Sequence, residues 1–139
     1  MARQCASHEL GDFASLRIGQ CLANQGLYKE AATSLNGFVR RRPHSLFAPD
    51  AWLLCATIST GPLDLPGTGE KILTAIIQRY PKSGSAETAL LYLATLAYWD
   101  KSWDRSEKLH REYLVKYPDS PNNDFIRDHR LPLIAKRGK

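Results

Sequence analysis

Three segments of the chain end in the same way, with a proline followed two residues later by a serine. These segments are 37-GFVRRRPHSLF-47, 75-AIIQRYPKSGS-85 and 111-REYLVKYPDSP-121. Pro43 and Pro81 lie 38 residues apart, and Pro81 and Pro118 lie 37 residues apart. A fixed period of about 20 to 50 residues is typical of repeat architectures. The spacing therefore predicts one structural unit that occurs three times in a chain of 139 residues.

Apolar residues within each unit recur every three or four positions, which is the period of a helix with one apolar side. Examples are Leu10, Ala14, Ile18, Cys21 and Leu22 in the first unit, and Ala86, Ala89, Leu90, Leu93 and Ala97 in the third. No segment alternates with period two for long enough to predict a strand. The sequence thus predicts an all-α chain of helix pairs, with helices at about 8–24 and 27–41, 48–60 and 68–80, and 85–99 and 102–117.

The residues between these helices are those that end one helix and begin the next. Pro118 cannot continue a helix, and it also disfavours helical geometry at the preceding residue. Ser120 offers an N-cap oxygen, and Pro121 suits the first helical position. Within the first unit, Gly26 can take the left-handed conformation that ends a helix, and Ser102 or Asp100 can cap the last helix of the third unit.

The pattern G-x-Y-x-x-A at residues 26–31, followed by Leu35 and Pro43, resembles a tetratricopeptide repeat. The small residue that this family has in the middle of its first helix falls on Gly19, Ala56 and Ala94. The resemblance covers about residues 8–121. It implies an α-solenoid of about three antiparallel helix pairs in a single domain, 1–139. The expected repeats are 8–44, 45–82 and 83–119, followed at 120–139 by a partial cap, with a short C-terminal helix, and a basic tail.

The chain departs from the family pattern in its second and third repeats. Pro66 and Gly69 replace an aromatic and a small alanine, while Ser106 and His110 stand where alanine and an apolar residue are usual. The period is also longer than the family's common 34 residues. The longer repeat, with its Tyr-Pro-x-Ser motif, is similar to the repeats of tetratricopeptide proteins of bacterial outer-membrane assembly and of the Tol envelope system. That similarity would imply an envelope or assembly scaffold.

The sequence contains no motif for catalysis, a cofactor or a metal ion, and we expect a non-enzymatic protein without either. The segment 66-PGTGEK-71 is similar to a phosphate-binding loop, but Glu70 stands where the loop needs glycine, and its carboxylate would repel phosphate. No two histidines have the i, i+4 spacing of a helical zinc site. The odd number of cysteines fits a reducing compartment, and Cys21 and Cys55 are expected to be small core residues.

The net charge of +5 is concentrated in the last thirteen residues, which hold five Lys or Arg and one Asp. With the arginines at 40–42, these residues form a candidate patch for nucleic acid or an anionic membrane surface. The candidate basic residues are Arg40, Arg41, Arg42, Arg127, Arg130, Lys136, Arg137 and Lys139. A solvated tail, and arginines that complement the dipole of a helix C-terminus, are the simpler interpretation.

Tetratricopeptide arrays bind partners on the concave surface formed by the first helix of each pair, and the resemblance carries those positions to this chain. The implied groove residues are Phe13, Leu16, Gln20, Asn24, Asp50, Leu53, Thr57, Thr88, Leu91, Thr95, Tyr98 and Trp99. Because the set holds no Lys or Arg, it suits an apolar or amphipathic segment better than a terminal carboxylate. Tyr98, Trp99 and nearby Trp103 are candidate anchors, although Trp52 and Trp103 also fit a core role.

The most economical function is that of a protein–protein interaction scaffold or adaptor, within a larger assembly. Exposed end faces of the array predict self-association or docking in a multi-subunit complex, since each repeat covers its neighbour. No apolar run approaches the roughly 20 residues of a membrane span, and residues 1–10 have no apolar leader. As the chain stands we expect a cytoplasmic protein, or one of the bacterial periplasm if a signal has been removed.

Overall fold

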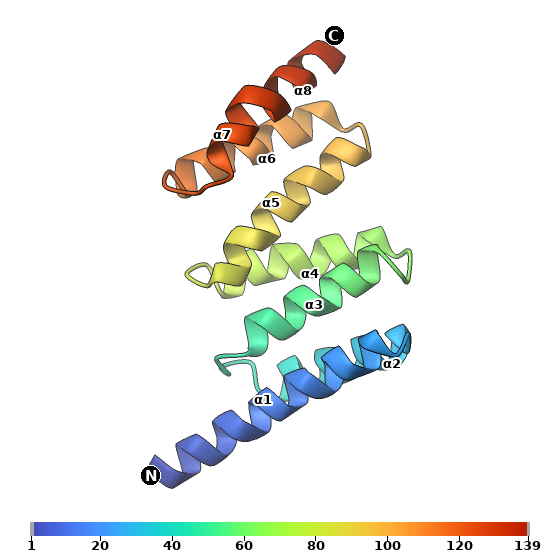
Figure 1. The fold of residues 1–139 in the computed structure, drawn as a ribbon, viewed down its shortest axis with the longest axis vertical. Coiled ribbons are helices and arrows are strands. Elements are labelled where there is room, and N and C mark those ends of the chain that lie inside the picture. The colour runs from blue at the N-terminus through green and yellow to red at the C-terminus, as the bar shows by residue number, and fades with distance from the viewer. Residues whose placement is uncertain (1, 139) are drawn as a thin grey trace.

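The computed structural model describes the backbone of residues 2–138 and the side chains of residues 9–138, and it is helical along most of that length. The helices are α1 (Ala2–Asn24), α2 (Tyr28–Arg41), α3 (Ala48–Thr60), α4 (Pro66–Arg79), α5 (Gly84–Trp99), α6 (Trp103–Lys116), the single turn α7 (Asn123–Phe125), the π-helical η1 (Ile126–Arg130) and α8 (Leu131–Arg137). Figure 1 shows them stacked in chain order, from α1 at one end of the array to α8 at the other.

Each helix packs on its neighbours in sequence, which is the pattern of a helical repeat. Contacts join α1 to α2, α3 to α4 and α5 to α6 within the pairs, and α2 to α3 and α4 to α5 between them. Helices α1, α3 and α5 also touch in succession. The expected all-α solenoid of three helix pairs is therefore confirmed. Two helix starts differ from expectation: α1 begins at residue 2 rather than 8, and α4 begins at Pro66, where a proline needs no amide hydrogen bond.

The links between pairs use their serines in different ways. Ser83 is a true N-cap of α5, and its hydroxyl accepts the Ala86 amide at 3.1 Å. Ser45 instead accepts the amide of Phe47, two residues on, and α3 begins only at Ala48. Ser120 likewise accepts the Asn122 amide, and Pro121 lies outside the helix. The prediction that Ser120 caps the next helix is therefore wrong, because the link here is two residues longer.

Two short turns within pairs require left-handed backbone. Gly26 has a φ of +80°, as predicted for the residue that ends α1. In the third pair the left-handed residue is Lys101, with a φ of 61°. Ser102 precedes α6, but its hydroxyl donates to Asp100 rather than accepting a helix amide. The prediction that the side chain of Ser102 or Asp100 caps α6 is therefore wrong.

Small residues at the predicted positions let the paired helices approach closely. Gly19 is buried on α1, and a Cβ there would lie 2.3 Å from Leu35 Cδ2 on α2. Ala56 and Ala94 hold the equivalent positions on α3 and α5 and are fully buried. The largest side chains of the core between the helices are Phe38, Leu35, Leu73, Ile76 and Tyr113.

The polar residues of the third repeat are buried with hydrogen-bond partners. Ser106 donates to the Ala94 carbonyl at 3.0 Å, so the hydroxyl bridges α6 to the small position of α5. His110 Nδ1 lies 2.8 Å from the Ser106 carbonyl oxygen. His110 is 1% exposed and occupies the position that Leu35 and Leu73 hold in the other repeats. Burial lowers the pKa of His110 below its usual value, an effect that Arg130 adds to and the bond to Ser106 opposes.

Residues 123–137 form one helical stretch that covers the outer side of α6. Pro132 does not interrupt it, although a proline normally breaks a helix, because the helix widens into the π-helical turn η1 just before the proline. The Leu131 amide there donates to the Ile126 carbonyl, five residues back. Ile126 packs with Tyr113 and Leu90, and Ile126 and Ile134 are 1% and 2% exposed. The C-terminal end of the array is thus closed by an apolar helix side.

The apolar stripe of α1 has the predicted helical period but does not face the core. Leu10 is 70% exposed and Ile18 is 55% exposed, and Ala14 and Cys21 are exposed as well. The side of α1 that packs on α2 carries Gly19 and Leu16 instead. The expectation of a core position is therefore confirmed for Cys55, which is 3% exposed, and wrong for Cys21.

Candidate functional site

The expected groove residues lie on α1, α3 and α5, and the structure places most of them at least partly within reach of a partner. Phe13, Asn24, Asp50, Thr88 and Trp99 are exposed. Gln20, Leu53, Thr57, Leu91, Thr95 and Tyr98 are half-buried. Leu16 is 7% exposed and belongs to the core, so it cannot serve as a contact residue. Since α1, α3 and α5 touch in succession, the set follows the length of the array rather than forming one compact site.

Hydrogen bonds between these helices fix how they lie beside one another. Asp50 on α3 accepts the Ser85 hydroxyl of α5 at 2.5 Å. Thr60 Oγ1, at the C-terminal end of α3, lies 2.6 Å from the Tyr92 hydroxyl in the middle of α5. Asp50 is therefore a joint between repeats as well as a candidate contact. The bonds hold the α3–α5 surface in one shape, which lowers the entropic cost of binding.

The aromatic residues at the end of α5 separate into one exposed side chain and one packed cluster. Trp99 is 65% exposed. Tyr98 packs edge-on against Trp103, with ring centroids 5.6 Å apart, and the Arg130 guanidinium lies 4.1 Å from the centre of the Tyr98 ring. Such a cation–π contact joins the C-terminal helical stretch to α5. Of the candidate anchors, Trp99 is the one that a partner can reach without disturbing the fold.

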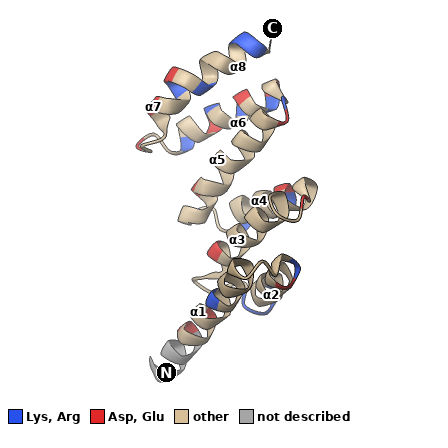
Figure 2. Cartoon of the chain, turned by 45° about the vertical axis from the view of Figure 1, so that its right-hand side comes forward, with Lys and Arg blue, Asp and Glu red and all other residues tan. Residues whose placement is uncertain are grey.

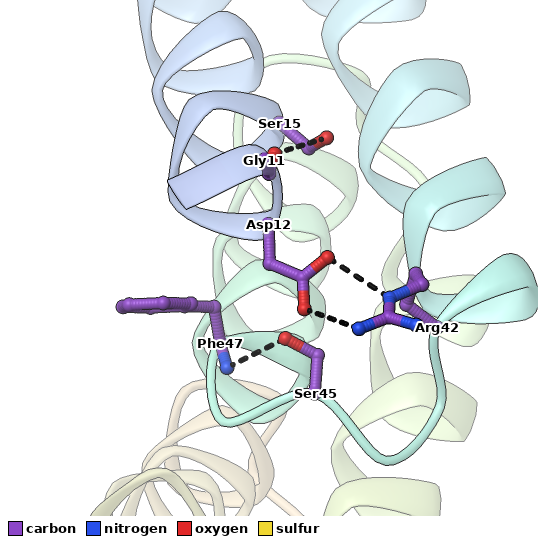
Figure 3. Close-up of polar contacts among 6 residues, drawn as sticks. All are labelled: Gly11, Asp12, Ser15, Arg42, Ser45 and Phe47. Carbon is purple, nitrogen blue, oxygen red and sulfur yellow. Dashed lines mark hydrogen bonds and ion pairs between the residues drawn. The ribbon is translucent and has the colours of Figure 1, made fainter. Parts of the chain in front are cut away.

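The arginines at the end of α2 do not form a uniform basic patch. Arg42 pairs with Asp12 on α1 through two hydrogen bonds, of 3.0 and 3.2 Å (Figure 3). The hydrogen bond and charge of Asp12 raise the pKa of Arg42. Arg40 and Arg41 are exposed. Asp12 was not among the predicted functional residues, because its partner lies thirty positions away in the sequence.

The basic residues of the C-terminus lie at the other end of the array from α2 (Figures 1 and 2). Arg130 is occupied by Tyr98 and Phe125, and Arg127 lies 3.7 Å from Asp124. Lys136 and Arg137 are exposed, and Lys139 lies outside the described residues. The structure therefore does not bring the two predicted basic clusters together. One arginine of each cluster, Arg42 at the end of α2 and Arg130 near the C-terminus, is engaged within the fold.

Removing the Asp12 carboxylate is expected to make the α1–α2 pair less sensitive to salt. Such a charged pair weakens as salt screens it, so the thermal midpoint of the native chain should fall between low and high salt. Asp12→Asn should lower the midpoint at low salt and flatten that dependence. The control is Asp124→Asn, which touches only the longer, exposed pair with Arg127. A salt dependence unchanged in Asp12→Asn would contradict a stabilising role for the Asp12–Arg42 pair.

One hollow that sequence reasoning did not identify lies between the first two inter-repeat links. It has a volume of about 490 Å³ and is lined by His44, Ser45, Leu46, Pro49, Arg79, Tyr80, Pro81, Lys82 and Ser83. Tyr80 lines it, and the Tyr80 hydroxyl donates to the Pro43 carbonyl at 2.5 Å. Burial raises the pKa of Tyr80, and Arg79 opposes that effect. The signal in the sequence was the pair of Pro-x-Ser links itself, which we interpreted only as helix punctuation.

One pair of side chains has the spacing of a nucleophile and a base, and it is buried. Ser106 Oγ lies 3.2 Å from His110 Nδ1, a distance found in nucleophile–base pairs, but the two residues are 0% and 1% exposed. A substrate cannot reach them. Within residues 9–138, no three His, Cys, Asp or Glu side chains are arranged to hold a metal ion. None of the helices in the described part of the chain is both long and apolar enough to span a bilayer.

A comparison with family models matches a tetratricopeptide repeat at residues 13–45. The match spans the C-terminal half of α1, all of α2 and the first part of the link to α3. No curated protein matches the chain. The second and third helix pairs, α3–α4 and α5–α6, repeat the arrangement of the matched pair, with Ala56 and Ala94 in the place of Gly19. Residues 13–45 therefore match a tetratricopeptide repeat, and the described chain is an all-α array of helix pairs consistent with that family.

Proposed function

We propose that this chain is a non-catalytic adaptor that holds a segment of a protein partner along α1, α3 and α5. Tetratricopeptide repeats generally mediate protein–protein interactions, which supports a protein partner. The observation that carries the proposal is the 65% exposure of Trp99, at the end of a row of half-buried apolar and neutral polar residues. Tryptophan is one of the residues enriched among binding hot spots.

The chemistry of the row favours an amphipathic partner segment. Leu53 and Leu91 are half-buried and supply apolar contact, while Thr57, Thr88 and Thr95 supply hydroxyls. The Thr95 hydroxyl already donates to the Leu91 carbonyl at 2.9 Å, so it offers a partner mainly its acceptor lone pairs. Asp50 is the one acidic side chain of the set. A partner with apolar residues on one side and a donor or cation near Asp50 would suit it.

Truncation of Trp99 tests the proposal. Trp99→Ala should weaken the affinity for the partner by about 30-fold, which corresponds to roughly 2 kcal/mol for a hot-spot aromatic. Affinity capture from native extract should then recover much less of the partner. Val115→Ala is the matched control, because Val115 is 81% exposed on α6, away from the row. Tyr98 is left intact, since its replacement would also release Trp103 and Arg130. Equal capture by wild type and Trp99→Ala would refute the groove.

The alternative adaptor role, on nucleic acid or an anionic membrane through basic residues, has weaker support. The two clusters lie at opposite ends of the array, and two of their arginines are engaged within the fold. Salt separates the alternatives. Binding through phosphates weakens steeply as salt rises, whereas capture that depends on Trp99 should change little.

We also propose a reducing compartment, such as the cytoplasm, for this chain. Of the cysteines whose side chains are described, Cys21 is exposed on α1 and Cys55 is buried on α3, and the two are free. Burial raises the pKa of the Cys55 thiol, which keeps it protonated and unreactive.

A further inference from the structure

The hollow between the first two inter-repeat links is lined from two segments that are far apart in the sequence. Residues 44–46 and Pro49 line it from the first link and the start of α3, and residues 79–83 line it from the end of α4 and the second link. Figure 1 shows both links on the same side of the array. We call this hollow of about 490 Å³ the link hollow. Its volume is within the roughly 300–1,000 Å³ of ligand pockets in proteins.

The charged residues that line the link hollow, Arg79 and Lys82, are cations without an ion pair. Both are exposed, and the ion pairs among the described residues involve neither of them. His44 adds an exposed imidazole from the first link. Asp50, near the start of α3, accepts the Ser85 hydroxyl at 2.5 Å and is not part of the lining. The link hollow therefore presents unpaired positive charge to a ligand.

Contacts within the fold hold the link hollow in shape. The Arg79 guanidinium lies 5.2 Å from the centre of the Trp52 ring, in a cation–π contact with a side chain that is 9% exposed. The Tyr80 hydroxyl donates to the Pro43 carbonyl, which joins the second link to the first. Arg79 and the two links are therefore placed before a ligand binds, so less conformational entropy is lost on binding.

The next junction, between the second and third links, carries a different charge pattern at the equivalent positions. Counted from the proline of each link, Lys116 corresponds to Arg79, and Asp119 corresponds to Lys82. Lys116 is paired with Glu112 at 3.0 Å. One cation is thus neutralised at the second junction, and the other is replaced by a carboxylate. The unpaired cations are therefore a property of the first junction and not of the repeat pattern.

At the second junction the chain also supplies a carboxylate where the first junction has a proline. Glu87 holds the position that Pro49 holds at the link hollow, again counted from the proline of the preceding link. The Glu87 carboxylate accepts the Tyr113 hydroxyl at 3.0 Å. The first junction thus combines two cations with an uncharged residue at this position, and a carboxylate there must come from a ligand.

The link hollow also offers an apolar contact. Leu46 lines it and is 78% exposed. The corresponding residues of the other two links are Gly84 and Pro121, so the first link alone has a large apolar side chain at this position. A ligand that used the whole hollow would therefore combine anionic groups with an apolar group.

We propose that the link hollow binds an acidic segment of a partner protein, in which carboxylates contact Arg79 and Lys82 and an apolar side chain packs on Leu46. A guanidinium can bind a carboxylate through two parallel hydrogen bonds, and a lysine binds it as a point charge. The net charge of +5 favours an acidic partner over a second copy of the chain. Two cations beside apolar surface suit a peptide better than nucleic acid, which is bound through a longer series of phosphate contacts.

Fluorescence anisotropy with a fluorescein-labelled peptide of glutamates and one central leucine tests the proposal. The full native chain should bind this peptide with a dissociation constant of about 10–100 µM, because the site is small and its charged contacts are partly exposed. Lys82→Asp should weaken binding by about fivefold or more, since an attraction becomes a repulsion. The variant should fold, because Asp119 stands at the equivalent position of the third link. A native chain that does not bind the peptide at about 1 mM overturns the proposal.

Lys108→Asp is the matched control for net charge. It makes the same change at an exposed position of α6 outside the link hollow, and it should bind the peptide like the native chain. An equal loss in Lys82→Asp and Lys108→Asp would show that net charge alone attracts the peptide, and it would overturn the site. If circular dichroism shows that Lys82→Asp unfolds, Arg79→Gln replaces it and should weaken binding about threefold, with Lys108→Gln as its control.

Changes in the peptide distinguish an acidic protein segment from other anions. Glutamine in place of glutamate should abolish measurable binding, and equal binding of that peptide would refute the role of the carboxylates. Serine in place of the leucine should weaken binding about threefold. Leu46→Ser should weaken the leucine peptide to the same extent and leave the serine peptide unchanged, because both changes remove one apolar contact.

A nucleic acid is the other anion to be compared. A single-stranded thymidine oligonucleotide of the same net charge should bind less tightly than the leucine peptide, because its phosphates make no use of Leu46. Tighter binding of the oligonucleotide that is lost in Lys82→Asp would identify a phosphate site and overturn the assignment to a protein segment.

The link hollow and the groove proposed above are tested separately. Trp99 lies at the C-terminal end of α5, whereas Ser83 of the hollow is the N-cap of that helix. Trp99→Ala should therefore bind the acidic peptide like the native chain, whatever its effect on affinity capture. A loss of peptide binding in Trp99→Ala as large as that in Lys82→Asp would place the peptide in the groove and overturn the link hollow as its site.

Discussion

Truncating Leu35 to alanine is expected to lower the free energy of unfolding by about 3 kcal/mol, within the range of roughly 2 to 5 for a buried leucine. Leu35 is fully buried on α2 and fills the space over Gly19 on α1. The loss combines the transfer of the isobutyl group to water with the cavity left between the two helices. Urea denaturation followed by circular dichroism measures it. The matched control is Val115→Ala on exposed α6, which should change stability by less than about 0.5 kcal/mol.

The contact between Gly19 and Leu35 should also make the effects of substitution non-additive. Gly19→Ala alone adds a Cβ about 2.3 Å from Leu35 Cδ2, and we expect a loss of about 1–3 kcal/mol from overpacking. In the double variant Gly19→Ala, Leu35→Ala, the new methyl group enters the cavity and alanine favours the helix. The double variant should therefore be more stable than the sum of the single losses predicts, by about 1 kcal/mol or more. Strict additivity would contradict the close approach of α1 and α2 at Gly19.

The helix pairs could be predicted from the sequence because both ends of most helices are marked locally. A proline prevents continuation after α2, α4 and α6, and Gly26 with a φ of +80° ends α1. The start of α1 could not be predicted, because residues 2–7 carry no clear apolar period. The π-helical turn before Pro132 was equally hidden, because the sequence shows the proline but not the adjustment that accommodates it.

The apolar period of a helix does not by itself predict whether the apolar side faces the core or the solvent. Leu10, Ala14 and Ile18 have the spacing of a core stripe, yet they face outward because α1 has no preceding pair in the described structure. The same limit applies to charges. Arg42 looked like part of a basic run, but its partner Asp12 is brought to it only when α1 packs on α2. Arg130 likewise became a contact of Tyr98 only through the fold of the last helical stretch.

Lowering the pH from about 7.5 to 5.5 is expected to destabilise the third helix pair through His110. The side chain is 1% exposed, and burial lowers its pKa. The unfolded chain therefore binds a proton below its ordinary value of about 6.5 while the folded chain does not. Stability is fully present above that value and falls as the pH drops toward the folded pKa, by at most about 1.4 kcal/mol per pH unit. Arg130, on the adjacent stretch, adds repulsion to a charged His110.

Replacing His110 by leucine should remove this part of the pH dependence. Leucine occupies the equivalent position in both other repeats, as Leu35 and Leu73, so His110→Leu should fit without a cavity. Denaturation at pH 7.5 and 5.5 should show a smaller loss of stability in His110→Leu than in wild type. His44→Gln, in an exposed link, should behave like wild type.

The structure suggests a cause for the acid sensitivity beyond one buried imidazole. Ser106 holds the Ala94 carbonyl on one side and His110 on the other, so the polar residues of this repeat join α5 to α6 where the other repeats have only apolar contacts. A proton on His110 would place a charge between that joint and Arg130. The same drop in stability in wild type and His110→Leu would show that another group is responsible. Slower amide exchange in α6 at pH 5.5 for His110→Leu than for wild type would locate the effect at this joint.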